Sequence, residues 1–244
     1  MPHAEKPPTK DAARSGAALL GRGVLVLLAG LYLSVFGVAG WIGIGFLRHH
    51  PFILDGPIQY YYALDGYLQP AILHGEHVLV WPNYYEERLP QYGDIAVFSL
   101  EDDPEGIYMM RIVGLPDDLM QTVQGVLLVN GTALEREKIG VRSVMDPEDP
   151  ERSVRVTEYL EHLPNGRTHL IWEENADGLF DKPSLSLVPK DQVLGLDDYR
   201  NNWLGNESAE VGVLVPIERL RHRAEVIIWS DDWSRIGLRL YDEE

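Results

Sequence analysis

Residues 23–47 contain no charged side chain and consist mostly of apolar residues and glycine. An α-helix rises about 1.5 Å per residue, so about 20 such residues cross the hydrocarbon core of a bilayer. A cleaved signal peptide is the competing interpretation, but its apolar core would span about 7–15 residues and end at small residues. The exit Phe46-Leu47-Arg48 does not fit that pattern. The stretch therefore predicts one uncleaved N-terminal transmembrane helix.

The charged residues divide the chain into two unlike parts. Of the 21 basic and 38 acidic side chains, residues 1–50 hold five and two, so residues 51–244 hold 16 and 36, a balance of −20. Under the positive-inside rule, the basic excess before the apolar stretch places residues 1–22 in the cytoplasm and residues 48–244 outside it. Such an acidic domain does not bind nucleic acid through a basic face. The acidic surface either keeps the domain soluble or meets a basic partner.

Residues 48–244 change from a continuous apolar run to short β-prone segments separated by turn residues. Asn130-Gly131 between two apolar segments is the strongest short signal for a hairpin. Strands at this spacing predict a mainly β domain, an antiparallel sandwich or barrel. Helix is scarce, with one short turn expected within 217–223, and residues 146–152 read as an exposed linker inside an insertion around 140–185. The expected strands include 77–81, 94–98, 110–113, 126–129, 154–156, 169–172, 213–215 and 224–229.

Several short motifs follow one another along this domain. They are Tyr67-Leu68-Gln69-Pro70, Gly75-Glu76, Gly93-Asp94 with an apolar strand, Met109-Met110-Arg111 before Gly114-Leu115-Pro116, and Asp197-Asp198-Tyr199-Arg200. In this order they resemble the motifs of bacterial type I signal peptidase, the membrane-anchored Ser-Lys protease family that trims signal peptides. The resemblance implies that Gly93, Asp94, Asp198 and Arg200 are structural motif residues. It also implies a single-pass protein of the bacterial inner membrane, held in lipid by residues 23–47, with its main domain in the periplasm.

Two positions depart from the family motifs. The family has its nucleophilic serine three residues before the proline, where this chain has Tyr67, and its lysine base before the arginine, where this chain has Met110. A lysine serves as a base because burial lowers its pKa, and methionine has no lone pair of that strength. The last motif has also lost its glycine and asparagine, at Asp197 and Tyr199. Losing one partner of such a pair costs several orders of magnitude in rate, so we expect a pseudoenzyme without a catalytic residue at these positions.

The favoured interpretation is an inactive, signal-peptidase-like scaffold or accessory subunit of a periplasmic membrane complex. The family binds its substrate as an added β-strand, which does not need the catalytic pair. The expected partners are other membrane or exported proteins, and two alternatives remain open: an active, diverged signal peptidase, and a structural membrane-surface module without a peptide groove. The residues expected to bind peptide or partner are Tyr67, Leu68, Gln69, Pro70, Met109, Met110 and Arg111.

The remaining candidates carry little chemistry. Lys138, beyond the Asn-Gly turn, and Lys182, in a proline-flanked loop, are both expected to be exposed. With Lys190 they are the only lysines of the outer domain. His74 and His77 lack a clear third ligand and are expected to be surface histidines. The sequence therefore predicts neither a metal site nor a cofactor.

Overall fold

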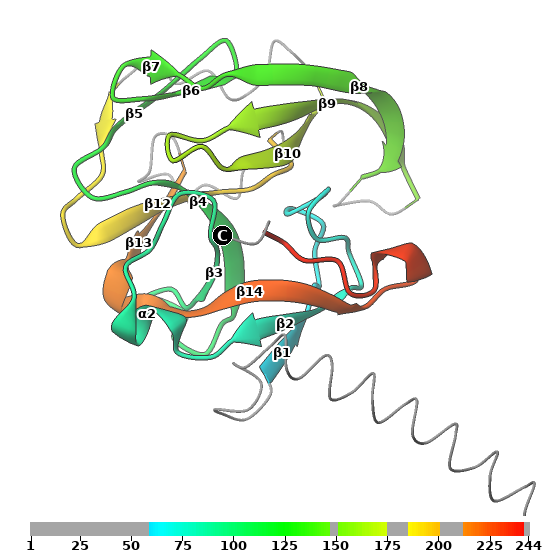
Figure 1. Ribbon diagram of the computed structural model, residues 1–244, viewed down its shortest axis with the longest axis horizontal. Coiled ribbons are helices and arrows are strands. Elements are labelled where there is room, and N and C mark those ends of the chain that lie inside the picture. The colour runs from blue at the N-terminus through cyan, green and yellow to red at the C-terminus, as the bar shows by residue number, and fades with distance from the viewer. Residues whose placement is uncertain (1–58, 147–150, 175–184, 201–211, 242–244) are drawn as a thin grey trace, which may run out of the picture. The chain divides into compact units, whose positions relative to one another are not determined.

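The computed structural model describes residues 59–146, 151–174, 185–200 and 212–241, all within one compact unit, Gly56–Glu244 (Figure 1). The predicted cytoplasmic segment 1–22 and the predicted membrane helix 23–47 lie outside these residues. Within the described ranges, no helix has both the length and the apolar character needed to cross a bilayer.

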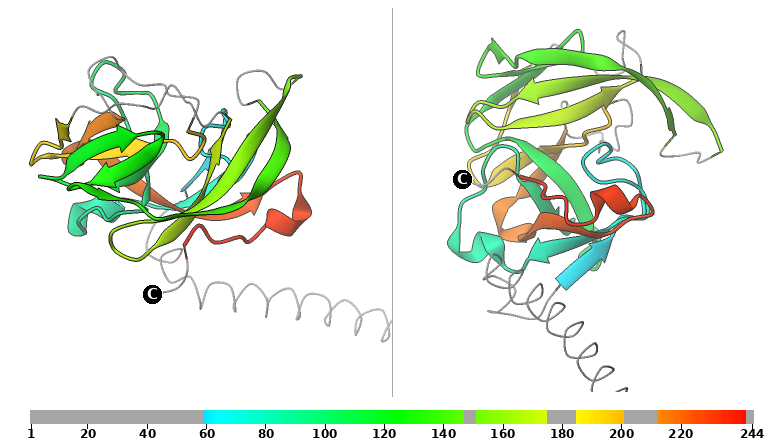
Figure 2. Two further views of the ribbon diagram at one scale, coloured as in Figure 1. Left: turned by 90° about the horizontal axis from the view of Figure 1, so that it is seen from above. Right: turned by 45° about the vertical axis from the view of Figure 1, so that its right-hand side comes forward.

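Antiparallel strands form three sheets, which confirms the mainly β fold expected from the sequence. The larger sheet has the strand order β1-β2-β14-β3-β4-β12-β13, and two smaller sheets have the orders β10-β9-β8 and β11-β5-β6-β7. Figures 1 and 2 show the three-stranded sheet beside the larger sheet, with the long β8–β9 hairpin curving away from it. The strands are β1 Gln59–Tyr62, β2 His77–Trp81, β3 Ile95–Phe98, β4 Tyr108–Gly114, β5 Leu119–Val123, β6 Val126–Val129, β7 Thr132–Ala133, β8 Arg136–Met145, β9 Ser153–His162, β10 Thr168–Glu173, β11 Ser186–Leu187, β12 Gln192–Leu196, β13 Val213–Pro216 and β14 Leu220–Trp229.

Within the described residues, helix is confined to short pieces, as the sequence predicted for the domain after residue 47. The α-helix α2 covers Tyr84–Glu87, and two 3-10 turns cover Ile217–Arg219 and Trp233–Arg235. The turn expected within 217–223 is thus confirmed only for its first residues, because β14 begins at Leu220.

The central strands are buried on both faces, and side-chain alternation divides the core between those faces. Along β4, Met110 and Ile112 pack in one cluster with Phe98 and Val193, whereas Val113 packs in another with Leu194. Successive side chains of a strand point to opposite faces, so residues 110 and 111 must face different surroundings. This division decides the geometry of the site described below.

The turn chemistry read from the sequence is present in the structure. Asn130 and Gly131 both have positive φ, 53° and 78°, and join β6 to β7 as a two-residue hairpin loop. Type I′ turns need positive φ at both central positions, which favours an Asn-Gly pair. Asp146 and Arg152, the two ends of the expected linker, lie at the end of the β8–β9 hairpin. There the Asp146 N–H donates to the Arg152 carbonyl oxygen.

Candidate functional site

The segment Gly195–Tyr199 lies against both family positions singled out in the sequence. Met110 packs on Gly195, where an added Cβ would lie 3.0 Å from the Met110 Cβ. The Tyr67 carbonyl oxygen accepts a hydrogen bond of 2.9 Å from the Tyr199 N–H. Asp197 lies between these two contacts in the sequence, two residues after Gly195 and two residues before Tyr199.

The turn that carries residues 67–70 is fixed by a buried ion pair. The Glu76 carboxylate accepts hydrogen bonds from the Leu73 N–H at 2.8 Å and from Arg235 Nε at 2.6 Å. Arg235 also donates to the Ala71 carbonyl oxygen at 2.9 Å. The C-terminal part of the chain therefore holds this turn in place.

Arg111 makes the most completely satisfied polar contact of the site. Its Nε and Nη2 donate to the two Asp198 carboxylate oxygens at 2.7 and 2.6 Å, and its Nη1 donates to the Gly93 carbonyl at 2.8 Å. Arg111 and Asp198 are both buried. Gly93 has a φ of +89°, and a Cβ added there would lie 3.0 Å from the Leu163 side chain. Glycine is therefore required at this position. A buried pair with this bidentate geometry fixes β4 against the segment after β12.

Asp94, the second residue of the Gly93-Asp94 motif, lies in a second buried polar group. Its carboxylate accepts from the Gln91 N–H at 3.1 Å and from Arg167 at 3.0 Å, and Arg223 lies 3.5 Å away. Burial raises the pKa of Asp94, while Arg223 and Arg167 oppose that rise. The motif thus serves to join the β3 strand to β14 and to the turn before β10.

A third group, which the sequence did not suggest, joins β9 and β10 to the last motif. Arg200 Nη2 donates to Glu161 Oε2 at 2.8 Å, and His169 Nε2 lies 3.4 Å from the same carboxylate. Burial lowers the pKa of His169 well below its usual value, and the charges of Arg111 and Arg200 lower it further. His169 is therefore neutral near neutral pH. No sequence signal marks Glu161 or His169, because they meet Arg200 only through the tertiary fold.

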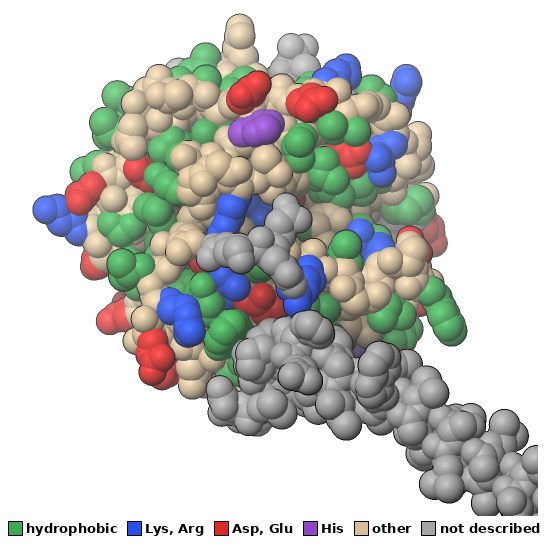
Figure 3. All heavy atoms as spheres, viewed as in Figure 1, with side chains coloured by type: hydrophobic (Ala, Val, Ile, Leu, Met, Phe, Trp, Pro, Cys, Tyr) green, Lys and Arg blue, Asp and Glu red, His purple; other side chains and the backbone are tan. Residues whose placement is uncertain are grey.

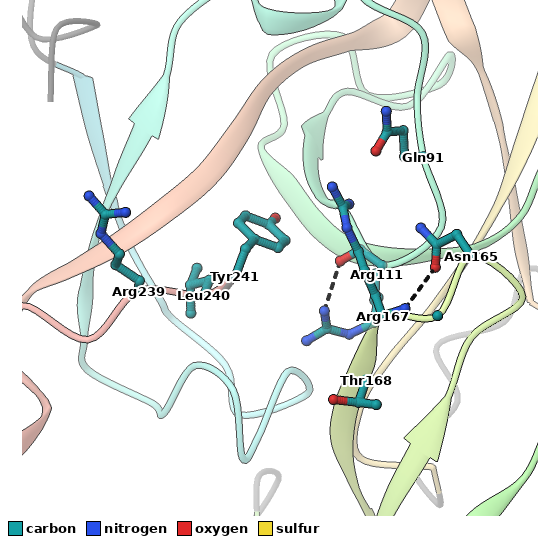
Figure 4. Close-up of a pocket in the computed structure, with 10 residues that line it drawn as sticks. Gln91, Arg111, Asn165, Arg167, Thr168, Arg239, Leu240 and Tyr241 are labelled. Atoms are coloured by element: carbon teal, nitrogen blue, oxygen red, sulfur yellow. Dashed lines mark hydrogen bonds between the residues drawn. The ribbon is translucent and has the colours of Figure 1, made fainter. Parts of the chain in front are cut away.

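A pocket of about 580 Å³ opens on the Arg111 side of β4. Arg111, Arg167 and Tyr241 line it together (Figure 4), and Figure 3 shows basic side chains gathered in the middle of this face. Both Arg111 and Arg167 are already paired with the buried carboxylates Asp198 and Asp94. The pocket is therefore polar, and two of its arginines, Arg111 and Arg167, are engaged in structural ion pairs.

Asp197 differs from all these groups. It is only 7% exposed, and among the described residues no hydrogen bond or ion pair engages its carboxyl. Burial raises the pKa of Asp197 to about 8, with the negative charges of Asp198 and Asp65 adding to the rise and Arg200 opposing it. Asp65 is itself exposed and precedes the Tyr67 turn, where its carboxylate accepts from the Tyr67 N–H at 3.4 Å. Asp65 and Asp197 thus belong to the two segments that the hydrogen bond from Tyr199 to Tyr67 joins.

The other predicted residues fall in different surroundings. Lys138 is exposed, as expected, and so is Lys190, whereas Lys182 lies outside the described residues. His77 packs among the rings of Tyr60, Tyr62 and Trp229. In the described part of the chain, no three side chains are arranged to hold a metal ion.

The residues expected to bind peptide are mostly buried in this structure. Tyr67 and Met109 are half-buried, and the peptide-binding role of the whole set stays a prediction. The buried members are Leu68, Gln69, Pro70, Met110 and Arg111.

Comparison with known proteins identifies related chains. A family model described as "Signal peptidase, peptidase S26" matches residues 52–229. Among curated proteins, the "Signal peptidase I" of Rickettsia typhi is 29% identical over 171 residues, covering 68% of this chain and 62% of that protein. The "Signal peptidase I" of Rickettsia felis is 28% identical over 188 residues, covering 72% of this chain and 68% of that protein. The aligned region thus spans about three-fifths of the length of the first of these relatives.

These names contradict the expectation of a pseudoenzyme. The reported relatives carry the name of a peptidase, so the comparisons point to an enzyme, and they give no support to an inactive scaffold. The expectation rested on the absence of a serine at position 67 and a lysine at position 110. It counted Asp197 only as a lost glycine, whereas the structure shows a buried carboxyl there.

Proposed function

Because the chain belongs to the signal peptidase S26 family, we propose that it is a membrane-anchored peptidase that cleaves the signal peptides of exported proteins. The observation that carries this proposal is the family match over residues 52–229, which includes every motif segment. The fold brings those segments together, because Arg111 binds Asp198 and the Tyr67 carbonyl accepts from Tyr199. A signal-peptide substrate and a location outside the cytoplasm are parts of the proposal.

The edge of the larger sheet supports a polypeptide substrate. β1 is the end strand in the described sheet and pairs only with β2 there. An extended peptide can add to such an edge through backbone hydrogen bonds, with alternate side chains giving specificity. Tyr60 and Tyr62 of β1 are exposed and provide an aromatic surface beside that edge. The strand leads, through residues 63–66, into the turn that carries Tyr67.

Cleavage of a preprotein by the purified full-length chain tests the proposal. The chain, reconstituted in detergent micelles or lipid vesicles, is incubated with a preprotein that an established Ser-Lys signal peptidase cleaves under the same conditions. We expect a shortened product whose new N-terminus, read by mass spectrometry, lies after the signal peptide.

A matched variant makes the negative result informative. The double change Tyr67→Ser with Met110→Lys places the family's pair at its own positions. Cleavage by the double variant but not by the natural chain would overturn the proposal, because the preprotein would then reach the site without being hydrolysed by the natural residues. The folding of both proteins is compared by circular dichroism.

A further inference from the structure

The polar pocket on the Arg111 side of β4 has the size of a small-molecule site. Its volume is about 580 Å³, and pockets for small molecules usually have about 300–1,000 Å³. Neither Tyr67 nor Met110 is among its described lining residues, so the pocket is separate from the positions where the family has its nucleophile and its base. The proposed peptidase chemistry therefore leaves this pocket without a role.

Four segments that lie far apart in the sequence build the pocket. They are the residues before β3, β4 itself, the turn between β9 and β10, and the residues after β14. In Figure 4, Arg239, Leu240 and Tyr241 lie on one side of the view, and Arg111 and Arg167 lie on the other. A ligand held between these two groups would contact several segments at once.

The charged side chains among the described lining residues are all arginines, namely Arg111, Arg167 and Arg239. This contrasts with the chain as a whole, which has a formal net charge of −17. Asp198 and Asp94, the carboxylates paired with Arg111 and Arg167, have side chains that are 0% exposed, and neither lines the pocket. The pocket therefore presents guanidinium groups to a ligand, and not carboxylates.

Arg111 keeps donors for a ligand in spite of its ion pair. A guanidinium group carries five N–H donors. The hydrogen bonds of Arg111 to Asp198 and to the Gly93 carbonyl use three of them, so two N–H donors remain within the described residues. Because the ion pair already fixes the side chain, binding a ligand costs little further conformational entropy.

Arg167 and Tyr241 form a second wall that is fixed in advance. Arg167 Nη1 donates to Asp94 Oδ1 at 3.0 Å and to the Tyr92 carbonyl oxygen at 3.3 Å. The guanidinium carbon of Arg167 lies 5.7 Å from the centre of the Tyr241 ring. The Tyr241 hydroxyl oxygen in turn accepts a hydrogen bond of 2.6 Å from the Ile95 N–H. The wall is thus pre-organised for a ligand.

We propose that this pocket binds a phosphate group, carried by a soluble phosphate compound or by a phospholipid headgroup. The planar fork of arginine matches the oxygens of phosphate and of carboxylate alike. A phosphate monoester carries about −1.5 to −2 charges at pH 7, more than a carboxylate. Its oxygens point in tetrahedral directions, so one group can accept from arginines of different segments. The exposed Thr168 adds a hydroxyl donor to the same pocket.

This inference goes beyond the proposed peptidase function and does not depend on it, because binding is measured directly. The purified full-length chain in a nonionic detergent is titrated by isothermal calorimetry with glycerol 3-phosphate, with dihexanoyl phosphatidic acid and, as a carboxylate comparison, with acetate. We expect saturable binding of a phosphate probe that is tighter than binding of acetate. No saturable binding of either phosphate probe, or tighter binding of acetate, would overturn the proposal.

The two phosphate probes distinguish the two sources of the group. Both carry a phosphate monoester, and only one carries acyl chains. Binding of glycerol 3-phosphate that is as tight as that of the lipid probe assigns the pocket to a soluble phosphate compound. Clearly tighter binding of the lipid probe assigns it to a phospholipid headgroup.

Two matched pairs of variants locate the binding in the pocket. Thr168→Asp adds a negative charge to the pocket, and Arg239→Gln removes a positive charge from it. The controls Thr132→Asp and Arg155→Gln make the same changes at exposed positions of β7 and β9. Each pocket variant should weaken phosphate binding about tenfold or more, because a hydrogen bond to a charged group contributes about that factor. The controls should bind with the natural affinity.

A conservative change separates charge from shape. Arg239→Lys keeps the positive charge and should retain most of the affinity that Arg239→Gln loses. Natural affinity in either pocket variant, with its fold confirmed by circular dichroism, would overturn the site. If Thr168→Asp does not fold, Arg239→Gln decides the matter, because residue 239 is exposed.

Discussion

Two consecutive residues of β4 and two consecutive residues after β12 build opposite kinds of environment on the two faces of one sheet. On one face Arg111 and Asp198 satisfy each other through two hydrogen bonds and are almost fully buried. On the other face Met110 packs on Gly195, two residues before Asp197, and the buried Asp197 carboxyl forms no ion pair among the described residues. One short segment therefore carries both a buried carboxylate in a structural ion pair, Asp198, and a buried carboxyl without an ion pair, Asp197.

The largest expected effect comes from breaking the buried ion pair between Arg111 and Asp198. Arg111→Met leaves Asp198 buried without its partner, and removing one member of a buried pair costs about 3–5 kcal/mol. Urea unfolding followed by tryptophan fluorescence measures this loss. The double change Arg111→Met with Asp198→Leu should recover part of it, and a single-variant cost below about 1 kcal/mol would contradict the assigned role.

A smaller loss of stability is expected from a larger side chain at Gly195, where β12 packs on Met110. Gly195→Ala would place its Cβ 3.0 Å from the Met110 Cβ and 3.3 Å from its Sδ. Overpacking of this kind costs about 1–3 kcal/mol. Thermal unfolding should show the loss, and adding Met110→Gly, which removes both the Cβ and the Sδ, should relieve the crowding. Unchanged stability in the single variant would show that β12 and β4 are less closely packed than described.

The pH dependence of stability sharpens the contrast between the two acids. The pKa of Asp197 is about 8 in the folded protein, above its ordinary value of 3.8, so its contribution to stability is fully present below about pH 4 and is lost as the pH rises through about 8. Asp197→Asn removes this dependence. Between pH 5 and pH 8 the variant should therefore gain at least about 1 kcal/mol relative to the natural chain, the equivalent of one pKa unit. Parallel unfolding curves at the two pH values would refute the raised pKa.

The smallest effect is expected far from both faces. Lys138 is an exposed residue of β8, and Lys138→Ala should change the unfolding free energy by no more than about 0.5 kcal/mol. Preprotein cleavage should also remain at the natural rate. A large loss of cleavage in this variant would show that Lys138 takes part in the reaction.

The strands and the motif scaffold were largely predictable, because they depend on local patterns. His77–Trp81 and Val126–Val129 were expected with the bounds the structure has, and Asn130-Gly131 forms the expected hairpin. β8 was not expected as a ten-residue strand, because most of its side chains are exposed and it carries no clear apolar period.

The chemistry of the site was less accessible from the sequence. Asp197 was noticed only as a departure from a motif, since a sequence does not show whether an acidic residue is buried or paired. The buried strand before two consecutive aspartates was the available signal: alternation requires one of them to face away from the arginine. Glu161 and His169 gave no signal, because their contact with Arg200 joins segments far apart in the chain.

The position of β14 has a consequence for how the protein acquires activity during synthesis. β14, residues 220–229, lies between β2 and β3 in the larger sheet, although it is the last of the described strands to be synthesised. Arg235, further on, fixes the turn that carries Tyr67. A growing chain therefore cannot complete the sheet or position this turn until its final residues have emerged. Under the proposed function, cleavage activity would therefore appear only after residues 220–235 have been synthesised and folded.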